Sequence, residues 1–144
     1  MVSERFEIEA PIEIVYSVVR GFADYPKFVP STRAAVERHA NASLLVDFEL
    51  DLIKTIRYTL KFQEKAPNEL TWEMVEGELM KFNRGAWKLK SAGEAKTEAV
   101  YEIDVGFGWM VPKSIIDRLT AVSLPETLKA FKNRAEKMHR EKKQ

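Results

Sequence analysis

The stretch that decides the fold runs from Leu44 to Phe62 and reads LLVDFELDLIKTIRYTLKF. Its apolar side chains occupy every second position: Leu44, Val46, Phe48, Leu50 and Leu52, then Ile56, Tyr58, Leu60 and Phe62. Charged and polar residues such as Asp47, Glu49 and Arg57 occupy most positions between them. Successive side chains of a strand point to opposite faces. The pattern therefore predicts two strands of an antiparallel sheet with one buried and one solvated face.

The same alternation extends outward on both sides of this stretch. It predicts further strands at Ser3–Glu9, Arg33–His39, Leu70–Met74 and Ala99–Val105. Asn41-Ala42 and Pro67-Asn68 are typical turn residues between neighbouring strands, and Gly77 ends another strand.

One predicted strand, Lys81–Lys90, does not alternate cleanly. Met80 and Phe82 have one parity, whereas Trp87 and Leu89 have the other. Either a bulge at Gly85 switches the phase, or Asn83 and Gly85 share the inner face with Trp87. We favour the second alternative, because a glycine there leaves room for a ligand or for a helix.

Helical patterns lie near both ends of the chain. Pro11 is suited to the first position of a helix that runs to about Val19, and Phe22–Pro30 reads as a helical turn and an ordered loop. Pro112 opens a second helical stretch with an apolar stripe: Ile115, Ile116, Leu119 and Val122, then Leu124, Leu128, Phe131, Ala135 and Met138. Pro125, within a potential capping box at Ser123–Glu126, predicts that this helix is kinked or restarted.

The overall composition limits the classes of protein to which the chain can belong. The 144 residues fit a single domain over 1–144, and 23 basic against 22 acidic residues leave a net charge of +1. We therefore expect no DNA binding. The chain has no cysteine, its first residues do not form a signal peptide, and no apolar run reaches the roughly 18 residues of a membrane span. A cytoplasmic location is the expectation.

The inner face of the predicted sheet is rich in large aromatic residues. One interpretation is that they only pack against the C-terminal helix. The other is that a curved sheet closed by one helix leaves a cavity for an apolar ligand, with tyrosine and tryptophan supplying polar tips. The sheet residues predicted to line it are Phe48, Tyr58, Trp72, Met74, Asn83, Trp87 and Tyr101.

The residues indicate no metal site, no cofactor and no catalytic group. The chain lacks zinc-ligand spacing, a phosphate-binding glycine loop and a nucleophile elbow. His39 and His139 have no obvious acidic partner, and we expect both on the surface. The protein is therefore expected to bind a ligand rather than to be an enzyme.

A basic run covers the end of the chain: Lys129, Lys132, Arg134, Lys137, Arg140, Lys142 and Lys143. Such a run is typical of the solvated face of an amphipathic helix, where cations also complement the helix dipole. The alternative is contact with a ribosome or with an anionic membrane surface.

Three segments resemble one known group of proteins. They are Ile8–Val19 followed by Phe22–Pro30, then Trp72–Gly77 with Asn83–Leu89, and finally Leu128–Ala135. They are similar to the START-like superfamily (SRPBCC), which includes coenzyme Q-binding proteins, polyketide cyclase/dehydrase-like proteins and ribosome-association toxin A-like proteins. Where quinone-binding members have an aromatic-rich segment in the last helix, this chain has Ser123-Leu124-Pro125-Glu126.

The resemblance implies the α+β helix-grip fold. A curved seven-stranded antiparallel sheet surrounds a long C-terminal helix, and two short helices follow the first strand. It also implies lipid binding, with a lipid- or isoprenoid-like molecule held between the sheet and the Pro112–Val122 helix, where Ile115 and Leu119 would form the lid. The alternatives are a polyketide cyclase/dehydratase-like enzyme using Tyr58, Tyr101 and Asn83, and a ribosome-associated regulatory protein.

Overall fold

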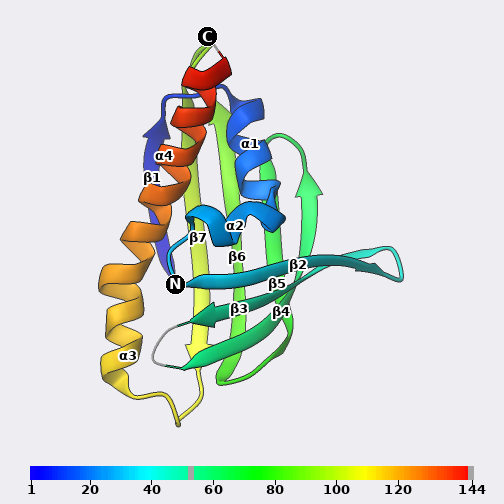
Figure 1. The fold of residues 1–144 in the computed structure, drawn as a ribbon, viewed down its shortest axis with the longest axis vertical. Helices are drawn as coiled ribbons and strands as arrows, with labels where there is room; N and C mark the ends of the chain where they lie inside the picture. The colour runs from blue at the N-terminus through cyan, green and yellow to red at the C-terminus, as the bar shows by residue number, and fades with distance from the viewer. Residues whose placement is uncertain (52–53, 143–144) are drawn as a thin grey trace.

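Within residues 1–51 and 54–142, which the computed structural model describes, seven antiparallel strands form one sheet in the order β1-β7-β6-β5-β4-β3-β2 (Figure 1). The strands are β1 Val2–Ile8, β2 Thr32–Ala40, β3 Ser43–Asp51, β4 Thr55–Lys65, β5 Glu69–Gly77, β6 Met80–Ser91 and β7 Thr97–Phe107. Every predicted strand is present. Leu52 of the predicted second strand lies outside the described residues.

The helices follow the predicted order. α1 (Ile12–Arg20) begins after Pro11, a 3-10 turn covers Phe22–Asp24, and α2 (Tyr25–Phe28) replaces the predicted loop. At the other end, α3 (Lys113–Arg118), a π-helical turn (η2, Leu119–Ser123) and α4 (Leu124–Lys142) run without interruption. This arrangement is the helix-grip fold that the resemblance implies.

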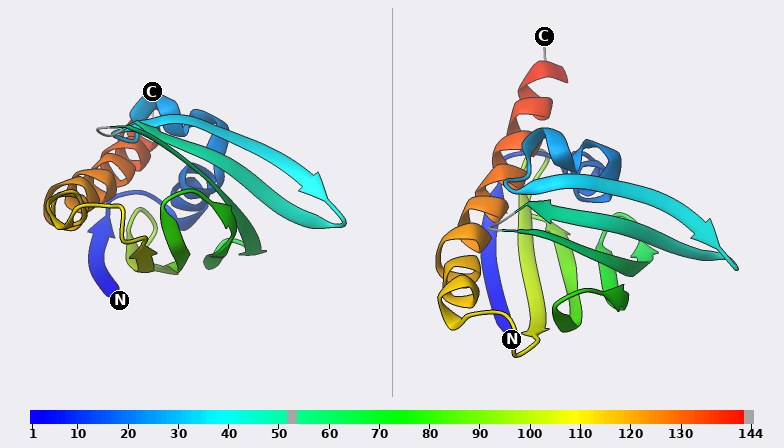
Figure 2. Two further views of the ribbon diagram at one scale, coloured as in Figure 1. Left: turned by 90° about the horizontal axis from the view of Figure 1, so that it is seen from below. Right: turned by 60° about the horizontal axis from the view of Figure 1, so that its bottom comes forward.

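The outer face of the sheet is polar, as the alternation predicts. Three outward-facing carboxylates of β7 form ion pairs with the neighbouring strands: Arg5–Glu98 at 2.6 Å, Lys88–Glu102 at 2.6 Å and Arg84–Asp104 at 2.9 Å. The opposite, concave face carries the aromatic residues. Figure 2 shows that the sheet curls strongly and that the β2–β3 hairpin extends beyond the other strands.

The concave face is covered differently along its length. Near the C-terminal end of α4, the side chains of α1 and the 3-10 turn fill the space. Val15, Val19, Phe22, Ala99 and Ala135 are all almost inaccessible there. We call this part the filled half. Toward α3, the inward-facing residues of β7 and of the helix are only half-buried. We call that part the hollow half.

The junction between α3 and α4 corrects one prediction. Ser123 does not cap a restarted helix; instead the backbone N–H of Leu124 bonds to the carbonyl of Leu119, which is a π-helical turn. Pro125 has no N–H for the regular helical ladder, so an irregular turn precedes it. Val122, expected on the apolar face, is exposed. An extra residue in one turn rotates the helix face by about 100°.

Candidate functional site

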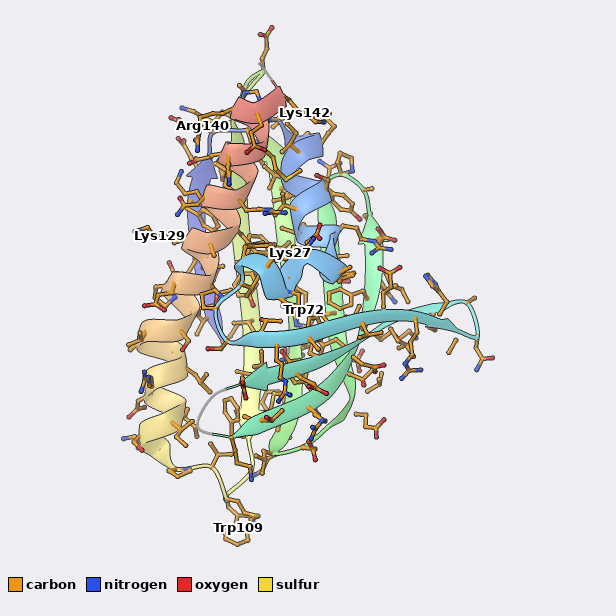
Figure 3. The ribbon with its side chains drawn as sticks, in the orientation of Figure 1. Lys27, Trp72, Trp109, Lys129, Arg140 and Lys142 are labelled. Atoms are coloured by element: carbon orange, nitrogen blue, oxygen red, sulfur yellow. The ribbon has the colours of Figure 1, made fainter. Side chains whose placement is uncertain are left out.

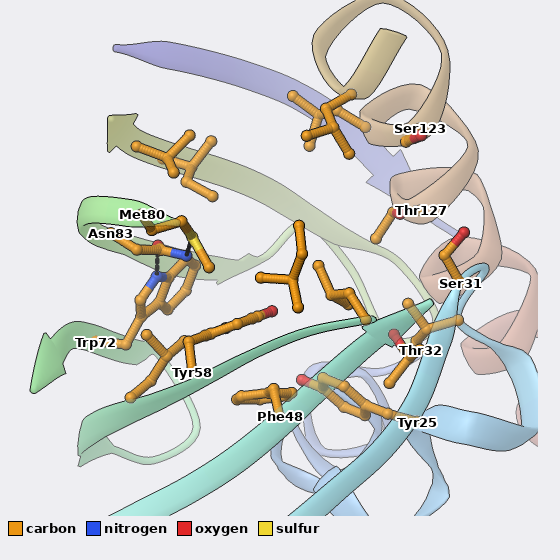
Figure 4. A pocket seen from close by; sticks show the side chains of 18 of the residues that line it. Tyr25, Ser31, Thr32, Phe48, Tyr58, Trp72, Met80, Asn83, Ser123 and Thr127 are labelled. Carbon is orange, nitrogen blue, oxygen red and sulfur yellow. Dashed lines mark hydrogen bonds between the residues drawn. The ribbon is translucent and has the colours of Figure 1, made fainter. Parts of the chain in front are cut away.

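The hollow half contains a cavity of about 240 Å³ between the concave face of the sheet and the helix η2–α4. This is larger than the roughly 150 Å³ apolar cavity that admits benzene, and close to the lower limit of small-molecule sites. Figure 4 shows Tyr58, Trp72, Asn83 and Met80 on one side, with Ser123 and Thr127 of the helix across from them.

Seven of the nine residues predicted for the ligand site line this cavity: Phe48, Tyr58, Trp72, Asn83, Trp87, Tyr101 and Leu119. Met74 and Ile115 lie outside it. The Met74 thioether packs over Gly77. Ile115 lines a separate groove of about 70 Å³ with Ile56, Leu79 and Met110. Ile115 lies one helical turn before Leu119, at the end of the molecule where the groove lies rather than over the cavity.

The helix that covers the cavity lies farther along the chain than the predicted Pro112–Val122 segment. Leu119, Thr120, Ser123, Leu124, Thr127 and Phe131 line that side, and Tyr25, Ser31 and Thr32 line the wall near α2 and β2. A sequence signal for the helical residues was present, because Ser123 and Thr127 are four residues apart and so share one helix face. Their short side chains leave space where longer ones would fill it.

The irregular strand β6 places Asn83 and Trp87 in the same cavity, as the favoured alternative predicts. No bulge lies at Gly85. The register instead shifts between Met80 and Phe82, so Met80 lines the cavity while Phe82 is exposed on the outer face. A Cβ at Gly85 would lie 2.5 Å from Cζ2 of Trp72 and would overlap the Glu102 carbonyl oxygen. Only glycine lets the Trp72 indole lie this close to β6.

Trp72 and Asn83 form a buried polar pair in the wall. The indole Nε1–H donates to Asn83 Oδ1 at 3.0 Å, and Asn83 is only 7% exposed. The amide Nδ2 of Asn83 faces the Met80 sulfur at 3.9 Å, a weak acceptor. The pair fixes the indole orientation, and among the described residues the Asn83 amide N–H groups meet only the weak Met80 sulfur acceptor.

Tyr58 and Tyr101 contribute two hydroxyls to the cavity. Tyr58 stacks on Phe48 with ring centroids 5.2 Å apart, and the Tyr101 ring lies 4.9 Å from Trp87. Within residues 1–51 and 54–142, neither hydroxyl has a hydrogen-bond partner, whereas the Tyr25 hydroxyl donates to the Val19 carbonyl. Burial raises the pKa of Tyr58 and of Tyr101 well above the usual tyrosine range. Both are therefore neutral phenols at physiological pH.

The described residues that line the cavity include no carboxylate, histidine, lysine or arginine. Among the described residues, no cluster of histidine and carboxylate side chains has the geometry to hold a metal ion. The lining can therefore hold an apolar body and exchange hydrogen bonds with a neutral polar group. A bound anion or cation would meet no opposite charge in this lining.

The basic residues of α4 are partly committed to the fold. Lys132 Nζ donates to the Glu7 carbonyl at 2.7 Å and to Glu136 at 2.6 Å, and Glu136 accepts the backbone N–H of Glu9. These hydrogen bonds hold α4 against the end of β1. Lys129, Arg140 and Lys142 are exposed (Figure 3), and Lys143 lies outside the described residues.

The two histidines occupy different environments. His39 is exposed, as expected, and its Nε2 lies 3.3 Å from Glu37. The expectation for His139 is wrong: this side chain is half-buried against the body of the molecule. Its Nε2 is inaccessible and has no hydrogen-bond partner among the described residues.

Comparison with protein families places most of the chain in a known family. The family described as polyketide cyclase / dehydrase and lipid transport matches residues 8–132, which is most of the chain. Among curated protein sequences, none matches. Among the residues that the structure describes, no helix is both long and apolar enough to cross a bilayer.

Several solved structures share the fold at low sequence identity. A START superfamily protein from Mycobacterium smegmatis has a TM-score of 0.80 at 20% identity, over 95% of this chain and 97% of that one. The Zhui aromatase/cyclase from Streptomyces sp. R1128 has a TM-score of 0.79 at 16% identity, over 94% and 92%. A STAR-related lipid transfer protein from Xanthomonas axonopodis has a TM-score of 0.69 at 13% identity, over 92% and 84%.

Proposed function

The chain belongs to the polyketide cyclase / dehydrase and lipid transport family, and we propose that it binds an uncharged, mainly apolar small molecule in the cavity of the hollow half. The observation that carries the proposal is the pair of cavity hydroxyls, Tyr58 and Tyr101, which have no partner among the described residues. Both side chains are half-buried and line the cavity, so their hydroxyls are available to a molecule that enters it. A ligand with a carbonyl or hydroxyl group could hydrogen-bond to either of them.

The lining and the volume of the cavity also indicate the shape, size and charge of the ligand. Its walls supply aromatic faces from Phe48, Trp72 and Trp87, which suit a flat or unsaturated apolar body. The volume of about 240 Å³ favours a compact, ring-sized molecule or one segment of an isoprenoid-like chain over a two-chain lipid. The absence of charge from the described lining disfavours a free carboxylate or an ammonium group.

Native mass spectrometry of gently purified protein, followed by organic extraction, tests this function. We expect a bound apolar molecule that the double variant Ser123→Leu/Thr127→Leu fails to retain, because both leucines project into the cavity. The control is Glu126→Leu/Lys129→Leu, which adds the same side chains to exposed positions of α4 and should retain the ligand. An empty wild-type protein, together with a crystal cavity too small for a ligand, would contradict the proposal.

A second candidate function is catalysis of a cyclisation or dehydration. The family description and the likeness to an aromatase/cyclase favour it. In this cavity Tyr58 or Tyr101 could donate a hydrogen bond to a substrate carbonyl, while the raised pKa values prevent either phenol from serving as a base near neutral pH. Turnover of a model aromatic polyketide that survives Tyr58→Phe/Tyr101→Phe/Asn83→Leu would exclude these three residues from catalysis.

A further inference from the structure

The loop between β7 and α3 carries two large apolar side chains into solvent. Trp109 is 90% exposed and Met110 is 65% exposed, and Figure 3 shows Trp109 projecting from one end of the molecule. The other two tryptophans, Trp72 and Trp87, are buried in the cavity wall. These two exposed apolar side chains do not contribute to the core of the protein, and exposed apolar groups of this kind often mark an interaction site.

The loop holds these side chains outward through its own backbone contacts. The N–H of Gly108 bonds to the Leu79 carbonyl at 2.8 Å, and the N–H of Val111 bonds to the Gly108 carbonyl at 3.1 Å. Val111 is buried, and Pro112 immediately precedes α3. Both ends of the turn are thus anchored, and Trp109 and Met110 form its tip.

Basic residues lie beside the tip. Lys54 lines the small groove with Met110, Lys113 begins α3, and Lys81 follows Met80, which pairs with Phe107. None of these three lysines forms an ion pair with a described residue. With Arg118, this end of the molecule has four cations against three anions, which are Glu78, Asp117 and Asp51 (paired with Thr55, next to Lys54). This is an excess of one positive charge.

The tip also lies at the end of the cavity. Phe107, two residues before Trp109, lines the cavity, and Ile56 lines both the cavity and the groove beside Met110. The exposed apolar side chains, the small groove and the cavity therefore form a continuous apolar series from solvent to the interior.

We propose that Trp109 and Met110, with Lys54, Lys81 and Lys113, form a docking surface for an anionic lipid bilayer. Tryptophan prefers the membrane–water interface, and lysines beside it attract anionic headgroups. A stable protein partner normally covers about 800 Å² of each surface, and two side chains at a projecting tip offer much less than that. This proposal goes beyond the proposed function, because it does not require the cavity to hold a ligand.

Sedimentation with vesicles tests the docking surface on the full-length protein. Vesicles of equal parts phosphatidylcholine and phosphatidylserine should bind wild type, and vesicles of phosphatidylcholine alone should bind it at least tenfold more weakly. Trp109→Ser/Met110→Ser should weaken binding at least tenfold. Each of Lys54→Gln, Lys81→Gln and Lys113→Gln should weaken vesicle binding about fivefold.

Fluorescence quenching tests the position of Trp109 directly. With vesicles that contain brominated lipid, wild-type tryptophan emission should be quenched. Trp109→Phe, which retains only Trp72 and Trp87, should not show this quenching.

Two matched controls separate this surface from others. Val36→Ser/Val75→Ser removes two exposed apolar side chains elsewhere on the sheet, and Lys129→Gln/Arg140→Gln/Lys142→Gln removes three charges from α4. Both should bind vesicles like wild type. The proposal would be overturned if wild type did not bind anionic vesicles at low salt. It would also be overturned if the Trp109→Ser/Met110→Ser variant bound those vesicles as well as wild type. A change in oligomeric mass caused by that variant without vesicles would overturn it in favour of self-association.

Discussion

The filled half and the hollow half share strand β7 and the C-terminal helix, yet only the filled half is densely packed. Along β7, Thr97 and Ala99 are fully buried, whereas Ile103, Val105 and Phe107 are half-buried. Along the C-terminal helix, Leu128, Phe131 and Ala135 are buried, whereas Leu119, Ser123 and Leu124 are half-buried.

The difference comes from what is placed over each part of the sheet. Phe22, from the turn after α1, packs into the filled half, where its ring lies 4.5 Å from Phe62 and 5.5 Å from Tyr25. Over the hollow half, the helix presents Thr120, Ser123 and Thr127 instead. The cavity therefore lies where Phe22 does not cover the sheet and where the helix presents short side chains, and not at a gap in the described sheet.

The largest expected difference between the halves is the loss of unfolding free energy when a phenylalanine is replaced by alanine. Phe22→Ala, at a residue only 1% exposed, should lower the free energy of unfolding by about 3–5 kcal/mol. Phe107→Ala, at a half-buried residue of the hollow half, should lower it by about 1–2 kcal/mol. Urea unfolding of both variants, after extraction of any ligand, measures the pair. Equal costs would mean that the hollow half is packed as tightly as the filled half.

Replacing a small side chain of α4 by leucine compares the two halves on a single helix. Ala135→Leu inserts a side chain at a fully buried site of α4 and should cost about 1–3 kcal/mol through overpacking. Thr127→Leu inserts the same side chain into the cavity, where space exists, and should leave the free energy of unfolding unchanged or increased. Thermal and urea unfolding compare the two variants. A Thr127→Leu variant as unstable as Ala135→Leu would contradict the presence of an open cavity.

The smallest of these effects is a pH dependence. The folded pKa of Tyr101 lies above its unfolded value of about 10, so the protonated phenol stabilises the folded state below that pH. As pH rises above 10, the unfolded chain loses this proton first and the stability declines, by about 1 kcal/mol at pH 11. Tyr101→Phe should therefore lose about 1 kcal/mol less than wild type between pH 8 and pH 11. The same loss in both proteins would show that the Tyr101 hydroxyl titrates as if in water.

The sequence predicts the sheet well because its signal is local. Leu44–Phe62 alternates at most positions, and the predicted strands match the observed ones to within a few residues. The parity change between Met80 and Trp87 indicates an irregularity in this strand, but alternation alone does not locate it. The structure places the register shift between Met80 and Phe82 and not at Gly85. Asn83 and Trp87 were still assigned to one face, since the parity between them is intact.

The helical side of the site was predicted less well, for a physical reason. A regular period of 3.6 residues groups Ile115 with Leu119 and Val122, but the π turn at Leu119–Ser123 changes the rotation. Val122 therefore faces solvent. Ile115, which precedes the π turn, lies one turn beyond the end of the cavity and lines the small groove. Ser123 and Thr127, whose short side chains leave the cavity open, are polar and so did not belong to any apolar stripe.

The central claim, that the hollow half is a binding site for an uncharged apolar molecule, is tested most directly by titration with N-phenyl-1-naphthylamine. This uncharged, ring-based fluorophore resembles the ligand that the cavity favours. Extracted wild type should bind one equivalent saturably. Binding to Ser123→Leu/Thr127→Leu should be at least tenfold weaker, and binding to Glu126→Leu/Lys129→Leu should be unchanged. Binding that is equal in all three proteins, or absent from the extracted wild type, would contradict the claim.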